Sequence, residues 1–149
     1  MSTPDPEPGP RSVPTPVDLL GLAGERLGPT PLTTVDAGDV AAYGSATGDP
    51  AVSTTSNEVP PMLLLSLVNL FLPQLLVVET FSMGVNVGLA GVTFPEGCGA
   101  GTAVSATGEV LGVEAKGDGP QIVVRVDLHA GGPRGPVVCS ADTISRFMP

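Results

Sequence analysis

The sequence of 149 residues has no tryptophan, one tyrosine, one histidine and, in Lys116, one lysine. A single histidine cannot form a histidine metal cage, and the two distant cysteines do not form a CxxC zinc site. The scarcity of aromatic residues also excludes a stacking platform for nucleic-acid bases. With six lysines and arginines and a net charge of -9, the chain lacks the basic surface that binds nucleic acids and anionic lipids. We therefore expect no metal, no cofactor, no nucleic acid and no membrane as a partner.

The two cysteines, Cys98 and Cys139, have no signal peptide ahead of them. This arrangement predicts a reducing, cytoplasmic setting and no disulfide framework. Cys139 is expected to be a small core residue of a strand. At 149 residues the chain is long enough for one hydrophobic core and too short for two. The sequence thus predicts one soluble domain.

The longest apolar run, PPMLLLSLVNLFLPQLLVV, extends from Pro60 to Val78. It is apolar on nearly every face, which in so small a chain indicates a helix enclosed by other elements. Pro60 and Pro61 suit a first helical turn, where a missing N–H and a fixed φ are tolerated. Polar residues interrupt the run before it reaches the roughly 20 apolar residues that a bilayer-spanning helix needs. We therefore predict a long central helix over residues 60–78.

The chain ahead of this run divides into a tail and the start of the domain. Residues 1–17 hold six prolines and almost no large apolar side chain, so we expect a disordered tail there and a domain over 18–149. A strand is expected near 31–35. A short helix follows, with Thr34 or Asp36 as its N-cap and Gly48 as its end.

The chain after the apolar run alternates between apolar and polar residues, as strands do. The expected strands cover residues 81–94, 102–113, 121–129 and 136–147, and the turn KGDG at 116–119 joins the second to the third. One buried helix followed by four antiparallel strands predicts an α+β fold in which the sheet wraps around the helix.

Several short strings then stand in the order of a known family. They are Tyr43 with Ala46–Asp49, Leu63–Leu67, Gly84–Gly88, Val92–Pro95 and Arg146–Pro149. With these strings the chain resembles the MaoC-like hotdog family of enoyl-thioester hydratases and dehydratases, especially its nodulation-protein-N-like branch. The resemblance covers about residues 19–149. It implies a single hotdog fold, an antiparallel sheet wrapped around a long central helix, which usually dimerises.

The resemblance also implies a catalytic pair that this chain does not complete. In the family, an aspartate matched here by Asp49 and a histidine five residues later activate a water for addition to an enoyl double bond, or run the reverse elimination. Here the fifth position is Thr54, which accepts no proton near neutral pH. Pro60 and Pro61 stand where the family has His-Gly, and the flap that carries the histidine is missing. The sole histidine, His129, is expected to be a solvated surface residue.

The candidate catalytic residues are Asp49, Tyr43 and Glu58. Asp49 matches the aspartate of the family, and Glu58 stands ahead of the central helix, where it could replace the missing base. Each candidate also has a structural alternative: a turn for Asp49, core packing for Tyr43 and a favourable charge at a helix N-terminus for Glu58. The candidate substrate-binding residues are Thr54, Asn57, Met62, Asn86 and Gly88.

Three functions remain open. The first is a repurposed hotdog enzyme that performs cyclisation, isomerisation or elimination on a bulky apolar metabolite such as a polyketide. The second is a conventional R-specific enoyl-thioester hydratase or dehydratase with a relocated base. The third is a non-catalytic partner subunit of a heterodimer. We favour the first, as a cytoplasmic homodimer with a small apolar substrate, because Asp49 is retained, the histidine is lost and few basic residues are available to bind coenzyme A.

Overall fold

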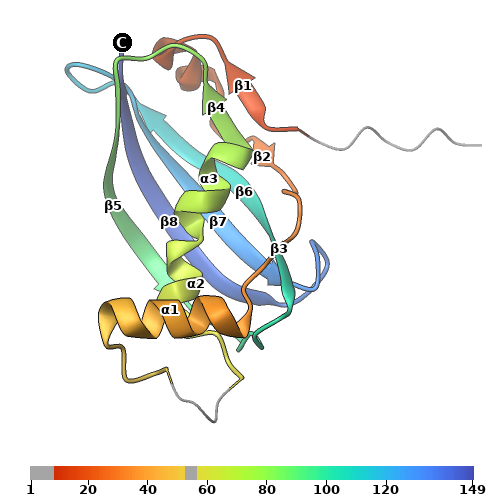
Figure 1. Cartoon of the computed structure of the whole chain (residues 1–149). Coiled ribbons are helices and arrows are strands. Elements are labelled where there is room, and N and C mark those ends of the chain that lie inside the picture. Colours follow the sequence, from red (N-terminus) through yellow and green to blue (C-terminus); the bar gives the residue numbers. More distant parts are fainter. Residues whose placement is uncertain (1–8, 53–56) are drawn as a thin grey trace, which may run out of the picture.

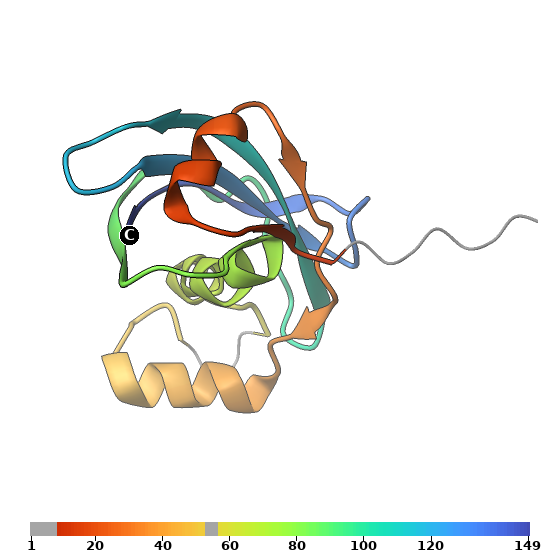
Figure 2. The same cartoon turned by 90° about the horizontal axis from the view of Figure 1, so that it is seen from above.

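A curved antiparallel sheet forms the body of the molecule in the computed structural model, which describes residues 9–52 and 57–149. The sheet wraps around two short helices, as Figures 1 and 2 show from two sides. Its strands run in the order β2 (Arg26–Leu27), β6 (Ala103–Glu114), β7 (Gln121–Ala130), β8 (Val137–Met148) and β5 (Met83–Thr93), and β3 (Thr33–Thr34) also pairs with β6. The expected α+β class, with a sheet around a central helical segment, is confirmed.

The four long strands lie where the alternation predicts them, within two residues at either end. On β7 the four apolar residues that were expected to face one way are all buried: Ile122, Val124, Val126 and Leu128. Arg125 and Asp127 between them point to the other face of the sheet. The period-2 pattern was reliable here because, in the described part of the chain, helices cover one face of this sheet and leave the other open (Figure 2).

The central helix is shorter than predicted, and it is broken. The segment forms α2 (Pro61–Ser66), α3 (Val68–Leu75) and then a strand, β4 (Leu76–Val78). At Leu67 the backbone amide bonds to the carbonyl of Leu64, three residues back, at 3.0 Å, which is the pattern of a tighter turn. Pro73 within α3 removes a further helical hydrogen bond. A single helix over 60–78 was therefore a wrong prediction.

The end of the segment is a strand because the N-terminal part of the chain pairs with it. β1 (Arg11–Val13) lies parallel to β4, with Ser12 opposite Val77. A 3₁₀ helix, η1 (Pro16–Gly21), follows and buries Pro16 and Leu19. Residues 9–17 are thus ordered where we expected a disordered tail, and residues 1–8 lie outside the described residues. Backbone pairing, which leaves no hydrophobic pattern in a proline-rich sequence, accounts for the difference.

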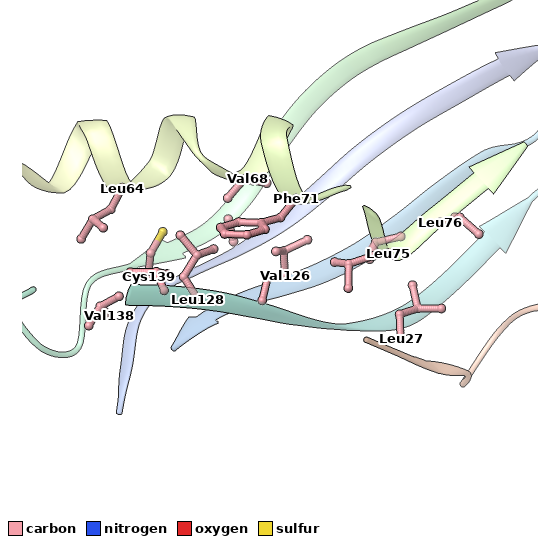
Figure 3. Packing of buried hydrophobic residues seen from close by; sticks show 14 of the residues in the cluster. Leu27, Leu64, Val68, Phe71, Leu75, Leu76, Val126, Leu128, Val138 and Cys139 are labelled. Atoms are coloured by element: carbon pink, nitrogen blue, oxygen red, sulfur yellow. The ribbon is translucent and has the colours of Figure 1, made fainter. Parts of the chain in front are cut away.

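The core lies between the two central helices and the concave face of the sheet. Phe71 and Leu75 of α3 are fully buried, and the first strand after η1 contributes Leu27. Figure 3 shows these side chains against residues of β7 and β8, including Leu128 and Cys139. Cys139 is a buried free thiol, as predicted, and burial raises its pKa to about 11. None of the helices in the described ranges is long and apolar enough to span a membrane.

The helix α1 (Ala37–Thr47) lies across the N-terminal end of α2 (Figures 1 and 2). Asp36 is its N-cap, and the Asp36 carboxylate accepts a hydrogen bond from the Asp39 amide at 2.8 Å. Asp39 in turn accepts from the Asp36 amide, which completes a capping box. Gly48 ends the helix with a φ of 68°, a left-handed conformation that glycine adopts without a steric penalty. The conformation of Gly48 therefore fixes the position of the Asp49 backbone at the end of α1.

Candidate functional site

Asp49 and Tyr43 form a direct contact at the C-terminal end of α1. The Tyr43 hydroxyl donates a hydrogen bond of 2.5 Å to Oδ2 of Asp49. The other carboxylate oxygen, Oδ1, accepts from the backbone amide of Ala51 at 2.8 Å. The backbone amide of Asp49 bonds to Thr47 Oγ1 at 3.2 Å. The two residues predicted as catalytic candidates are thus brought together, and a turn of backbone holds the carboxylate from the other side.

This contact shifts the pKa values of the two groups in opposite directions. The hydrogen bond from Tyr43, helped by that from Ala51, lowers the pKa of Asp49 below its ordinary value of 3.8. The same hydrogen bond, with burial and the charge of Asp49, raises the pKa of Tyr43 above its ordinary value of 10.0. At neutral pH the pair therefore consists of a carboxylate and a protonated phenol. Asp49 is a stable anion here and a weak proton acceptor.

Replacing Tyr43 with phenylalanine is expected to raise the pKa of Asp49. The Asp49 carboxylate then loses the hydrogen bond that lowers its pKa most, while the weaker effect of the Ala51 amide remains. A carboxyl group whose folded pKa is depressed stabilises the fold above its unfolded pKa, and this stabilisation is lost as the pH falls through the folded pKa. The variant should therefore lose its acid stability at a higher pH than the wild type. Titration of the Asp49 side-chain carbon by NMR measures the shift, and an unchanged pKa would contradict the contact.

Glu58, the third catalytic candidate, is placed in a different local structure. It forms an isolated antiparallel bridge with Gly99 ahead of α2. Its carboxylate lies over Gly97, so closely that a Cβ atom at Gly97 would come within 2.9 Å of Oε2. Burial raises the pKa of the Cys98 thiol, and the charge of Glu58 adds to this effect. Glu58 thus belongs to the loop pair 57–59 and 98–100, whereas Tyr43 and Asp49 belong to α1 and the turn after it.

The start of α2 is built from the two prolines, which carry no amide hydrogen. Pro60 is the N-cap, and its carbonyl accepts from the amides of Leu63 and Leu64. Met62, a predicted substrate-binding residue, is 56% exposed in this first turn. Asn57 is also exposed, and its carbonyl accepts from the amide of Ala100 at 2.5 Å. Another predicted substrate-binding residue, Thr54, lies outside the described residues.

The remaining two predicted substrate-binding residues, Asn86 and Gly88, line a pocket of about 140 Å³ between the central helices and β5. The sequence reasoning missed the other residues of this pocket: Leu65, Val68, Asn69, Leu89 and Thr143. Asn69 carried the one available signal, because it interrupts an otherwise apolar run. Asn86 donates from Nδ2 to Oδ1 of Asn69 at 3.2 Å. The pocket is therefore apolar with a polar side.

His129 is half-buried and hydrogen-bonded, which corrects the expectation of a solvated surface residue. Its Nε2 lies 2.9 Å from Oγ1 of Thr107, and its Nδ1 lies 3.1 Å from the carbonyl of Gly135. Because a carbonyl only accepts, Nδ1 carries the hydrogen, and in the neutral ring Nε2 then accepts from the Thr107 hydroxyl. The ring lines a pocket of about 430 Å³ together with Arg125 and Asp127, which face away from the core.

The described residues contain no cluster of three or more histidine, cysteine, aspartate or glutamate side chains that could hold a metal ion. The candidate residues offer an anion, a phenol, amides and hydroxyl groups. Such groups bind and orient a substrate, and they stabilise charge that develops in a transition state.

Comparison with known proteins agrees with this fold. No family model matches the sequence. The chain is 28% identical over 146 residues to 3-hydroxyacyl-thioester dehydratase Z of Mycobacterium tuberculosis, covering 88% of this chain and 94% of the relative. The Mycobacterium bovis protein of the same name matches equally well.

Solved structures with the same fold are more distant in sequence. The (R)-hydratase from A. caviae involved in PHA biosynthesis has a TM-score of 0.64 at 17% identity, over 85% of this chain and 96% of that one. The MaoC-like dehydratase from Rhodospirillum rubrum has a TM-score of 0.64 at 14% identity, over 85% and 93%. The truncated HadBC (3R-hydroxyacyl-ACP dehydratase) complex from Mycobacterium tuberculosis has a TM-score of 0.60 at 14% identity, over 84% and 96%. The chain therefore has the hotdog fold of the MaoC-like dehydratases and (R)-hydratases, and its sequence resembles a 3-hydroxyacyl-thioester dehydratase.

Proposed function

We propose that the protein is an enzyme of the hydratase-like fold that performs a cyclisation, isomerisation or elimination on an apolar, polyketide-type acyl substrate. The observation that carries this proposal is the state of Asp49. Its two oxygens are engaged by Tyr43 and Ala51, its pKa is lowered, and position 54 holds a threonine. An anion held in this way stabilises positive charge or orients a hydroxyl group, and it is poorly suited to accept a proton from water.

The small content of basic residues supports the same proposal. The chain has six lysines and arginines in all, and two of its arginines, Arg11 and Arg125, pair with acidic side chains. A substrate recognised mainly through its apolar chain fits this surface better than one recognised through the phosphates of coenzyme A. In such a site, binding the chain in a reactive conformation supplies much of the acceleration.

A second candidate is a conventional 3-hydroxyacyl-thioester dehydratase that uses a relocated base. The specific observation in its favour is the similarity to dehydratase Z, which extends over 88% of this chain and 94% of that protein. In this reading Glu58, at the loop ahead of α2, would be the base. The two candidates differ in the rate that they predict for the simplest enoyl thioester.

The test is to assay the purified protein with crotonyl-CoA and, separately, with a long-chain polyenoyl thioester of N-acetylcysteamine. We expect crotonyl-CoA hydration to be slower than that of dehydratase Z by about 10²- to 10⁴-fold, the usual contribution of a general acid-base residue. The polyenoyl thioester should give a product of unchanged mass, as a cyclisation or an isomerisation requires. Hydration of crotonyl-CoA at the rate of dehydratase Z would support the second candidate instead. Turnover of neither compound would favour a non-catalytic partner subunit.

We also propose that the protein is a homodimer joined through β5. This strand is an edge of the sheet, and ten of its eleven residues are exposed. Its outward apolar side chains include Met83, Val85 and Val87, which are 56%, 38% and 52% exposed. A long apolar edge strand favours pairing with another strand unless a charge or proline interrupts it, and β5 contains neither.

Substituting lysine for Val87 is expected to convert the dimer to a monomer, because the charge would have to be desolvated at the paired edge. Light scattering on a size-exclusion column measures the mass. Leu111→Lys is the matched control, since Leu111 is 40% exposed on β6, away from this edge. A wild-type protein that is monomeric at all concentrations would refute the dimer.

A further inference from the structure

The pocket between α2, α3 and β5 has one feature that its volume alone does not explain. Two polar side chains, Asn69 and Asn86, line it, and a third, Ser145, hydrogen-bonds to Asn86 from the neighbouring strand. Asn69 comes from α3, Asn86 from β5 and Ser145 from β8. Asn86 and Ser145 are paired residues of neighbouring strands, so their side chains point to the same, helix-facing side of the sheet.

These three side chains form a chain of hydrogen bonds that all run in one direction, from Ser145 through Asn86 to Asn69, which we call the polar relay. The Ser145 hydroxyl, on a residue that is 5% exposed, donates to Oδ1 of Asn86 at 3.3 Å. That bond orients the Asn86 amide so that its nitrogen donates to Oδ1 of Asn69 at 3.2 Å. The relay then ends in the side-chain nitrogen of Asn69, which carries two hydrogens. Among the contacts of the described residues, none occupies this nitrogen, so the relay presents donors at the pocket.

The other described residues of the wall offer no competing polar group of this kind. The Thr143 hydroxyl donates to the backbone carbonyl of Val124 at 2.8 Å, so it is used within the sheet. The apolar side chains of Leu65, Val68 and Leu89 form most of the remainder. The volume is about 140 Å³, so the pocket holds only a short stretch of a chain. The pocket therefore fits a short stretch of an acyl chain that has one acceptor atom.

We propose that this pocket binds an acyl chain through a carbonyl oxygen of the substrate, which accepts a hydrogen bond from the side-chain amide of Asn69. The proposal rests on the proposed function, because it takes the substrate to be an acyl compound, and it adds the chemical group that the site recognises. The carbonyl is either that of the thioester or a ketone within the chain. A protonated amine could not form this bond, since it has no lone pair to accept a hydrogen from the Asn69 amide.

Three pantetheine thioethers of equal chain length test the proposal by calorimetric titration. One carries a plain octyl chain, one a ketone beside the sulfur-bound methylene, and one a ketone in the middle of the chain. We expect one of the two ketones to bind about fivefold more tightly than the plain chain, as one added neutral hydrogen bond predicts. The ketone that is preferred distinguishes the thioester position from a position within the chain.

Two substitutions at Asn69 should abolish the preference. Asn69→Asp keeps the shape and replaces the donors with an acceptor, whereas Asn69→Leu removes both. Asn69 is exposed, so neither change disturbs the core. Gln74→Leu is the control, because it makes the same amide-to-leucine change on α3 outside the pocket, and it should leave the preference intact.

The outcomes separate this inference from the proposed function. Equal binding of all three compounds to the wild type would overturn the recognition of a carbonyl and leave an acyl-binding site in place. A preference that survives in both Asn69 variants would also overturn it. Binding of none of the compounds would refute the inference together with the acyl substrate of the proposed function.

Discussion

Asp49→Asn is expected to lower kcat/KM on the polyenoyl thioester by about 10²- to 10³-fold, which is the usual cost of removing one preorganised electrostatic group from a site. The neutral amide keeps the size of the side chain but loses the charge that the Tyr43 hydroxyl and the Ala51 amide hold in place. Product formation followed by mass spectrometry measures the loss. Because Asp49 lies in a partly exposed turn, the substitution should leave the fold intact.

Asp118→Asn is the matched control for this experiment. It makes the same change of charge at an exposed position in the turn between β6 and β7, far along the chain from Asp49. It should leave kcat/KM within about twofold of the wild type, since exposed charges in water interact weakly. Full activity in Asp49→Asn would mean that Asp49 only shapes the turn. It would contradict the proposed function, which rests on the charge of Asp49.

Phe71→Ala is expected to lower the free energy of unfolding by about 3–5 kcal/mol, the usual cost of deleting a fully buried phenylalanine side chain. Phe71 is 0% exposed at the centre of α3, where the sheet closes over the helix (Figure 3). The loss combines the transfer of the ring to water with the cavity left behind. Urea denaturation with linear extrapolation measures it.

Met62→Ala is the control for the core substitution. Met62 is 56% exposed on α2, so its truncation should change the free energy of unfolding by no more than about 0.5 kcal/mol. A cost below about 1 kcal/mol for Phe71→Ala would mean that the sheet does not close tightly over α3. Similar costs for the two variants would contradict the arrangement of the core in the same way.

The sequence predicted the outer architecture well because its signals are local. The four long strands follow from period-2 alternation, and α1 follows from its capping residues, Asp36 and Gly48. A capping box and a left-handed glycine act within a few residues, so no distant contact is needed to specify them. The contact of Tyr43 with Asp49 is of the same kind, since the residues are six apart across one helix end.

The central segment was harder to predict because its apolar run supports more than one structure. The run contains a strand, β4, at its end, and a buried helix and a buried strand look alike in hydrophobicity. The choice was made by β1, whose backbone pairs with residues 76–78. A partner strand more than sixty residues away does not change the hydrophobic pattern of residues 76–78, so that pattern could not predict the pairing.

The polar relay illustrates the same limit for the site. Asn69 and Asn86 are 17 residues apart, and Asn86 and Ser145 are 59 apart. Their meeting depends on the register between β5 and β8, with its irregularity after Asn86. A shift of one residue would turn Asn86 to the other face of the sheet. The sequence alone could name Asn86 as a candidate, but it could not supply its partners.

The sequence by itself determined the fold class, the strands, the capped helix and the absence of a second histidine. These depend on composition and on interactions between residues close along the chain. Only the tertiary structure decided where the central helix breaks, that His129 is hydrogen-bonded on both ring nitrogens, and that Asn69 meets Asn86. Each of these depends on which strands pair and in which register. The energy of such pairing depends on both segments together, so the sequence of one segment alone does not predict it.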